Sequence, residues 1–302
     1  MPWLILVLIA YFFLALVNVG DKFLIDNKIK SPAVYTFYIS IALTIFLLAI
    51  PFIGFEILPW PYIGIALLSG FLFNYSLYWM YQAMKKTDAS IAIPAYASFL
   101  PLFSFLFTFL FTGERLSILQ ALAFLLLILG SVVINYKGGN KINFGVIKAC
   151  VIGTFFLALA LFLSKYVYLA SNNFLSDFLW IKIGGMSASI FFYIFFREVR
   201  REVSFRPSPM QIKNIGIFVL VQSAGATSNI LQNIAISIAP FSMLSVINAL
   251  QGVQYVFLFI FTFVLSRKFP EKFHEDYSYV SIIRKVIATI LIFFGLFLLV
   301  YK

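Results

Sequence analysis

The residues of this chain that could act chemically are amides, phenols and a lysine placed inside long apolar segments. One such segment carries Asn74 and Tyr78, and another carries Asn229 and Asn233. In each pair the residues are four apart, so they share one face of a helix. A polar side chain in apolar surroundings is costly unless it has a hydrogen-bonding partner. We therefore expect these two faces to line a water-filled cavity and to hydrogen-bond a polar solute.

Three more polar residues extend this set. Asn248 and Gln251 lie in the segment 240–266, and Lys182 lies between isoleucines in the segment 174–196. A lysine ammonium at the edge of a cavity favours a solute with a carboxylate or a phosphate. The alternative for the amides is hydrogen bonding between packed helices, worth ~0.6 kcal/mol on average, and the alternative for the lysine is a structural role. The residues alone leave both alternatives open.

The remaining reactive residues do not form the groups that an enzyme needs. The one histidine, His274, lies in a charged stretch, and the one cysteine, Cys150, lies in an apolar segment. An enzyme requires a nucleophile, an acid–base pair or a metal cluster, so we expect no catalytic residue, no metal and no cofactor. The carboxylates close to the apolar segments all fall near segment ends: Asp21, Asp88, Glu114 and Asp177. This placement argues against a transporter that relays protons through a buried acid. Asp21 beside Lys22 is the best remaining pair, and an interfacial ion pair is its alternative.

The elements that must position these residues are long apolar segments. Hydrophobic residues make up 63% of the chain and charged residues 11%, and a helix needs roughly 20 apolar residues to cross a bilayer. We therefore predict an all-α integral membrane protein with about ten transmembrane helices. Their expected bounds are 3–25, 32–54, 61–83, 89–112, 116–136, 143–169, 174–196, 211–236, 240–266 and 282–301.

The net charge of +11 does not indicate nucleic-acid binding. Lysine and arginine lie in short connectors, where they anchor helix ends and set topology. The connectors also carry helix breakers, such as Gly138-Gly139, Pro207-Ser208-Pro209 and Pro270. Most of the basic residues follow the odd-numbered segments. The positive-inside rule then places these connectors in the cytoplasm and both termini outside.

The two halves of the chain resemble each other in three places. The matched segments, in order, are Phe12–Leu16 with Phe155–Leu159, Pro94–Thr108 with Ser245–Phe259, and Leu126–Gly130 with Leu291–Gly295. The first match also places Lys22 on Lys165. Five helices is an odd number, so two copies must cross the membrane in opposite senses, which gives the inverted repeat typical of secondary transporters. We predict two inverted five-helix repeats, the first over residues 1–137 and the second over residues 143–302.

Residues 82–135 contain a more specific pattern. A segment with Pro94 and Pro101 is followed by Gly113-Glu114-Arg115-Leu116, and the next segment ends near Gly130. This pattern resembles the EamA-type repeat of the drug/metabolite transporter superfamily. In the second half, Leu265-Ser266-Arg267 stands where this repeat has Gly-Glu-Arg, so the pattern departs there.

The resemblance implies two five-helix halves around a central cavity, lined mainly by the third, fourth, eighth and ninth helices. It also implies export or exchange of small metabolites. Proteins of this family have cytoplasmic termini, in conflict with the charge distribution, so the topology stays open.

These expectations combine into one functional hypothesis. The chain is expected to be a secondary transporter that moves a small polar metabolite, amino acid-like or another organic solute, by alternating access, as an exporter or an exchanger. The alternative is a flippase for a lipid-linked headgroup, which would share the fold but needs a cavity open sideways to lipid. The expected partners are the small-molecule substrate and the lipid bilayer, with no nucleic acid, and a homodimer stays open. The expected location is a bacterial-type plasma (inner) membrane, crossed many times.

Overall fold

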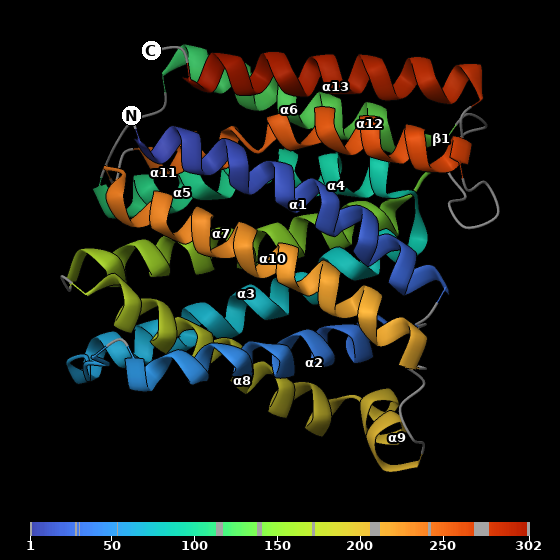
Figure 1. Cartoon of the computed structure of the whole chain (residues 1–302). Helices are drawn as coiled ribbons and strands as arrows, with labels where there is room; N and C mark the ends of the chain where they lie inside the picture. The colour runs from blue at the N-terminus through green and yellow to red at the C-terminus, as the bar shows by residue number, and fades with distance from the viewer. Residues whose placement is uncertain are drawn as a thin grey trace.

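The structure is a computed structural model of the chain (Figure 1). It describes residues 2–27, 29, 31–52, 54–112, 117–137, 141–170, 173–205, 212–240, 243–268 and 278–300. Several residues singled out in the sequence lie outside these ranges: Gly113-Glu114-Arg115-Leu116, Gly138-Gly139, Pro207-Ser208-Pro209, Pro270 and His274.

The described chain is helical apart from one pair of two-residue strands. The helices of the first half are α1 (Pro2–Asn27), α2 (Pro32–Ala42), the 3-10 helix η1 (Leu43–Phe52), α3 (Trp60–Lys86), α4 (Ala89–Ser98), α5 (Leu100–Thr112) and α6 (Ile118–Asn135). Strands β1 (Tyr136–Lys137) and β2 (Lys141–Ile142) pair antiparallel. The second half contains α7 (Phe144–Ala170), α8 (Phe174–Phe195), α9 (Arg197–Phe205), α10 (Ile212–Ile238), α11 (Leu244–Ala249), α12 (Gly252–Lys268) and α13 (Tyr279–Val300).

The helices are those of a multi-pass membrane protein. Within the described residues, seven helical stretches are long and apolar enough to cross a bilayer. They are Pro2–Asp26, Pro32–Phe52, Trp60–Lys86, Ala89–Phe111, Phe144–Ala170, Phe174–Phe195 and Ile215–Ile238. Each coincides with a predicted span. Helix α6, helices α11 and α12, and helix α13 occupy the other three segments for which spans were predicted.

Two of the predicted helices are broken in the structure. The segment 89–112 breaks at Phe99, between α4 and α5. Pro101 explains this break, because its nitrogen has no hydrogen to bond the carbonyl one turn earlier. The segment 240–266 breaks at Leu250 and Gln251, before α12 begins at Gly252. At the 151-residue shift Gly252 aligns with Pro101, so both segments break at the equivalent place.

Two other features differ from the prediction. The segment 32–54 is α-helical only to Ala42 and continues as the 3-10 helix η1. Helix α9 was expected to be a connector, but Arg197–Phe205 forms a short helix of its own at the edge of the bundle (Figure 1). Its sequence is strongly charged, which hid it from a search for apolar segments.

The long helices pack in pairs that mix the two halves of the chain. Helix α3 packs along α7 and α8, α1 packs along α10, and α6 packs along α13. Glycines permit a very close approach between α3 and α8. A β-carbon on Gly184 would lie 2.1 Å from the carbonyl oxygen of Leu67, and one on Gly70 would lie 1.8 Å from that of Ile181. No side chain fits between the two backbones at this crossing.

Two lysines inside the bundle bind helix ends. The Nζ atom of Lys22 donates to the carbonyl oxygens of Met84 (2.6 Å) and Thr87 (2.9 Å), at the end of α3. The Nζ atom of Lys165 donates in the same way to the carbonyl of Ile236 (2.8 Å), at the end of α10. The last carbonyls of a helix have no partner within the helix, and a lysine satisfies them well. The aligned lysines therefore cap the aligned helices of the two halves.

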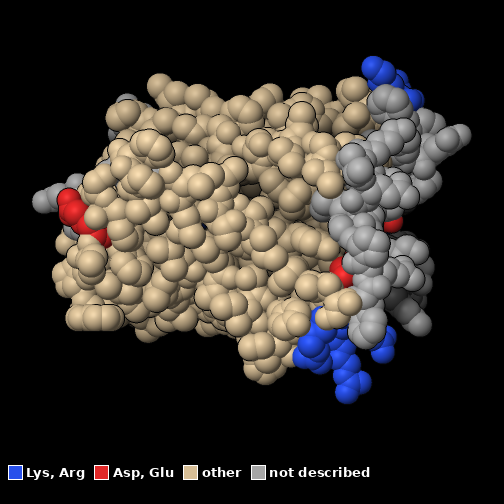
Figure 2. Space-filling view, turned by 60° about the horizontal axis from the view of Figure 1, so that its bottom comes forward, with Lys and Arg blue, Asp and Glu red and all other residues tan. Residues whose placement is uncertain are grey.

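The charged side chains visible on the surface in Figure 2 lie at the two ends of the bundle. In Figure 2 the long side of the molecule is almost free of charge, and the Lys and Arg side chains in view lie at one end. Three exposed basic residues of the described chain are Lys148, near the start of α7, and Arg197 and Arg201, in the short helix α9. Glu56, which follows η1, bonds Asn173, which precedes α8, through a contact of 3.0 Å. An uncharged belt between charged ends is the surface that a bilayer requires.

Candidate functional site

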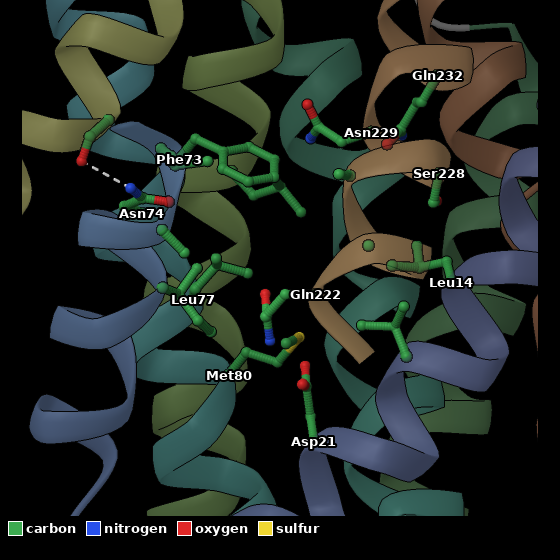
Figure 3. Close-up of a pocket in the computed structure, with 18 of the residues that line it drawn as sticks. Leu14, Asp21, Phe73, Asn74, Leu77, Met80, Gln222, Ser228, Asn229 and Gln232 are labelled. Atoms are coloured by element: carbon green, nitrogen blue, oxygen red, sulfur yellow. Dashed lines mark hydrogen bonds between the residues drawn. The ribbon is translucent and has the colours of Figure 1, made fainter. Parts of the chain in front are cut away.

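A cavity of about 300 Å³ lies between the long helices. Its walls come from α1, α2 with η1, α3, α4, α7, α8 and α10, together with Leu100 at the start of α5 and Gln251 at the α11–α12 break. Most of the lining is apolar, and a small number of amides, hydroxyls and charged groups interrupt it (Figure 3). The volume is at the lower end of the range of ~300–1,000 Å³ for small-molecule sites. The cavity therefore suits a small solute.

Five of the seven residues proposed from the sequence line this cavity: Asn74, Lys182, Asn229, Asn233 and Gln251. They come from α3, α8, α10 and the turn before α12. The packing of these helices brings together residues that are far apart in the chain.

Lys182 is held against the cavity by aromatic rings and one amide. Its Nζ atom lies 4.5 Å from the ring centre of Phe178 and 5.6 Å from that of Phe73, and it donates a hydrogen bond to Oδ1 of Asn229. Ring faces attract an ammonium group. Lys182 is 5% exposed, so it does not extend to the membrane surface. Because Lys182 lines the cavity, its amine is within reach of a solute there.

The two asparagines of α10 form a hydrogen-bonded pair. Nδ2 of Asn233 donates to Oδ1 of Asn229 (3.1 Å) and to the backbone carbonyl of Asn229 (2.8 Å). The hydroxyl of Tyr168 donates to Oδ1 of Asn233 (2.8 Å). A chain of bonds thus runs from α7 through α10 to Lys182 on α8. It fixes the orientation of both amides at the cavity wall.

Asn74 and Gln251 meet the cavity in different ways. Nδ2 of Asn74 donates to the carbonyl of Gly185 (2.7 Å) and to the hydroxyl of Ser40 (3.2 Å), which joins α3 to α8 and α2. Asn74 therefore connects helices as well as lining the cavity. The Oε1 atom of Gln251 is buried and has no hydrogen-bond partner within the described residues. That oxygen is an acceptor that a solute or water can use.

Tyr78 and Asn248 lie away from the cavity lining. The ring of Tyr78 packs 5.6 Å from that of Phe192 and 5.2 Å from that of Phe196, and its hydroxyl accepts from Nε2 of Gln82 (3.0 Å). Asn248 is buried, and its Nδ2 donates to the hydroxyl of Ser104 (2.8 Å), which joins the α11 region to α5. In this conformation both residues hold helices together.

Asp21 lines the cavity, although the sequence placed it near a helix end. Helix α1 continues to Asn27, and Asp21 is 1% exposed. Its two oxygens accept from the hydroxyls of Tyr35 (2.5 Å) and Tyr81 (2.9 Å), and Gln222 donates to the Tyr35 hydroxyl (3.3 Å). Asp21 is therefore a buried carboxylate, so its place near a segment end does not exclude a buried acid.

Sequence reasoning also paired Asp21 with its neighbour Lys22. In the structure Lys22 turns to the end of α3 and forms an ion pair with Asp26 (3.0 Å). The signal that points to Asp21 is its spacing from Asn18, because residues three apart share a helix face. Asn18 and Asp21 both line the cavity. A polar pair on one face of an apolar helix is the pattern that was used for α3 and α10.

The mouth of the cavity lies on the side of the bundle. Among its lining residues, Ile45 of η1 is 64% exposed and Val219 of α10 is 54% exposed. Both belong to membrane-spanning stretches. Figure 2 shows a hollow in the uncharged side of the molecule, between its charged ends. The opening therefore faces the region that lipid occupies.

The fold and the cavity define the class of protein, a helical multi-pass membrane protein with a solute-sized cavity. Comparison with known proteins agrees. Residues 1–136 match the EamA-like transporter family. The match covers 136 of the 302 residues and agrees with the pattern in residues 82–135; the family is part of the drug/metabolite transporter superfamily. Proteins of this family are transporters and not enzymes, so a small solute and the bilayer are its partners.

Solved structures support the fold over the whole length. One crystal structure of a protein with no stated activity has a TM-score of 0.57 and 16% sequence identity, and the match covers 97% of this chain and 93% of the other. At this identity the match shows the fold alone. No curated protein matches the chain.

Proposed function

We propose that this protein is a secondary transporter that moves a small polar metabolite, amino acid-like or another organic solute, by alternating access. The observation that carries the proposal is the cavity itself, because helices from both halves of the chain line it and charged groups interrupt its apolar wall. Substrate sites at the junction of two repeats are typical of secondary transporters. We assign it to export or exchange across a plasma membrane, in line with its family.

The proposed architecture is ten helices in two inverted repeats, over residues 1–137 and 143–302. Three features of the packing support it. The capping lysines of the two halves, Lys22 and Lys165, bind equivalent helix ends. The segments 89–112 and 240–266 break at equivalent places. Helix α1 packs along α10 in the same way that α7, its counterpart, packs along α3.

In the proposed site, Lys182 and Asn229 bind an anionic or polar group of the solute. Asn74, Asn233 and Gln251 supply hydrogen-bonding groups around it. Tyr78 and Asn248 can contribute only in a second conformation, because they pack between helices in this one. A transporter that alternates must repack its helices, so these two residues remain part of the proposal.

Counterflow into proteoliposomes tests the proposal. The full-length protein is reconstituted, the vesicles are loaded with an unlabelled solute, and uptake of the labelled solute is followed. Asn229→Ala is expected to lower the apparent affinity about tenfold or more, since it removes an amide that would contact the solute and that positions Lys182; a hydrogen bond to a charged group is worth ~1.5–3 kcal/mol. Thr227→Ala, an exposed position on the same helix, is the control. Equal kinetics in the two variants would remove Asn229 from the site.

The side opening favours a second candidate function, a flippase for a lipid-linked headgroup. Ile45 and Val219 at the mouth would contact acyl chains while the headgroup enters the polar interior. The two functions are distinguished by the substrate. Saturable counterflow of a soluble metabolite supports the transporter. Movement of a lipid-linked headgroup between leaflets, with no counterflow of soluble solutes, supports the flippase instead.

A further inference from the structure

We propose that Asp21 and Asn18 form a subsite for a protonated amine, so that the solute carries both an ammonium and an anionic group. The inference rests on the proposed transport function and names the class of its substrate. It starts from the carboxylate of Asp21, which lines the cavity and is nearly inaccessible from outside.

Asp21 has no cationic partner within the described residues. The ion pairs Lys22 with Asp26 and Lys285 with Asp88 do not involve it. The hydroxyls of Tyr35 and Tyr81 donate hydrogen bonds that satisfy part of the accepting capacity of the carboxylate. A buried carboxylate is stabilised mainly when an opposite charge accompanies it, and the cavity leaves room for such a charge to arrive with a solute.

The acceptors at this end of the cavity suit an ammonium group. A carboxylate offers about four acceptor positions; the two tyrosines use two of them, and Gln222 also interacts with the carboxylate. Asn18, one helical turn before Asp21, is 2% exposed, and its Oδ1 has no hydrogen-bond partner within the described residues. An ammonium carries three donors and no acceptor. Asp21 and Asn18 therefore present spare acceptors on one face of α1.

The walls beside Asp21 indicate an organic cation. Met80 of α3 lies next to the carboxylate in the cavity (Figure 3), and Leu77 of α3 and Val17 of α1 also line the cavity. Apolar walls fit the carbon skeleton that an amine carries. A hydrated inorganic cation would gain nothing from them, because it requires polar contacts on all sides.

The opposite charge lies at the other end of the cavity. Figure 3 shows Asp21 near Gln222 at one end and Asn229 at the other. Gln222 and Asn229 are seven residues apart on α10, which corresponds to about 10 Å along the helix. Asn229 binds Lys182. Asp21 and Lys182 therefore lie toward opposite ends of one cavity, an arrangement that fits a small dipolar molecule.

The experiment compares four solute classes in counterflow with the full-length protein. One set shares a carbon skeleton: L-leucine carries both charges, isopentylamine only the amine, and 4-methylpentanoate only the acid. Glucose represents neutral polar solutes, and 5-aminopentanoate tests a wider separation of charges. The variants are Asp21→Asn and Lys182→Gln. Asp26→Asn and Lys148→Gln are matched controls at exposed positions.

The expected result is transport of one or both dipolar solutes at least tenfold more efficiently than their singly charged analogues. Asp21→Asn should abolish the preference for the dipolar solute over the analogue that lacks the amine. Lys182→Gln should abolish the preference over the analogue that lacks the carboxylate. Both control variants should keep the wild-type preferences. If the wild-type protein prefers a singly charged or neutral solute to the dipolar ones, the inferred amine subsite is wrong. The proposed transport function still stands in that case. Equal selectivity in Asp21→Asn and Asp26→Asn also overturns it. If none of the solutes shows counterflow, the result counts against transport of soluble metabolites. The inference about the amine subsite is then wrong as well.

Discussion

The crossing of α3 and α8 yields the sharpest prediction about stability. Gly184→Ala adds one methyl group where the backbone of Leu67 already lies, with the new carbon 2.1 Å from the carbonyl oxygen and 2.5 Å from Cα of Leu67. A favourable carbon contact requires ~3.5 Å. The helices would have to separate by about 1.4 Å at this point to restore that contact. A rotamer change cannot relieve the clash, because both partners are backbone atoms.

The magnitude follows from two opposing effects. Overpacking in a tight interior typically costs ~1–3 kcal/mol. Replacing a helical glycine by alanine returns ~0.5–1 kcal/mol through the lower entropy of the unfolded chain. We therefore expect Gly184→Ala to lose about 1–2 kcal/mol of stability. Gly64→Ala, on the same helix α3 as Leu67, should gain stability, because a β-carbon at Gly64 meets nothing within 4 Å.

The assay is thermal unfolding of the purified protein in detergent, followed by tryptophan fluorescence. Gly184→Ala should unfold at a lower temperature than wild type, and Gly64→Ala at the same or a higher temperature. Gly70→Ala should resemble Gly184→Ala, since its new carbon would lie 1.8 Å from the Ile181 carbonyl at the same crossing. If Gly184→Ala and Gly64→Ala unfold together at or above the wild-type temperature, the close approach of α3 and α8 is refuted.

Three further predictions concern other parts of the bundle. Lys165→Met leaves the carbonyls at the end of α10 without their donor and should cost ~1–3 kcal/mol in unfolding, whereas exposed Lys148→Met should cost nothing measurable. Tyr81→Phe removes one of the two donors to Asp21 and should lower the unfolding temperature, while the more exposed Tyr193→Phe should not. Cys150 is fully buried, so maleimide should not label the native protein. Single thiols from Lys148→Cys and Ile57→Cys should then react from opposite sides of the membrane, with Lys148→Cys on the cytoplasmic side if the charge distribution governs topology.

The sequence predicted the spans well because length and apolarity are local properties. A proline such as Pro101 also reveals where a helix breaks. The equivalent break at Gln251 has no proline and could be found only by aligning the halves. Helix α9, from Arg197 to Phe205, escaped because a charged surface helix has neither the length nor the composition of a span.

The site was predictable in part. Lys182 and Asn229 were both candidates, but their bond joins residues 47 positions apart and depends on how α8 packs near α10. Asp21 was missed for a different reason. Its sequence neighbour Lys22 indicated a surface ion pair, but the lysine turns to the end of α3 and the carboxylate turns inward. Adjacent residues on a helix point in directions about 100° apart, so adjacency in the sequence says little about contact.

The proposed duplication distinguishes structural residues, which occur in both halves, from the charged residues of the cavity, which do not. The elements that occur in both halves are structural, as with the capping lysines Lys22 and Lys165. The charged groups of the cavity occur once. At the shift that aligns the lysines, Asp21 corresponds to Ser164, which also lines the cavity but bonds Ser69 (2.7 Å). A cavity made by two identical halves would bind symmetric solutes. The cavity has a carboxylate, Asp21, at one end and an ammonium, Lys182, at the other, so opposite charges are separated along it. Only a dipolar solute, with its amine toward Asp21 and its anionic group toward Lys182, can pair with both ends at once.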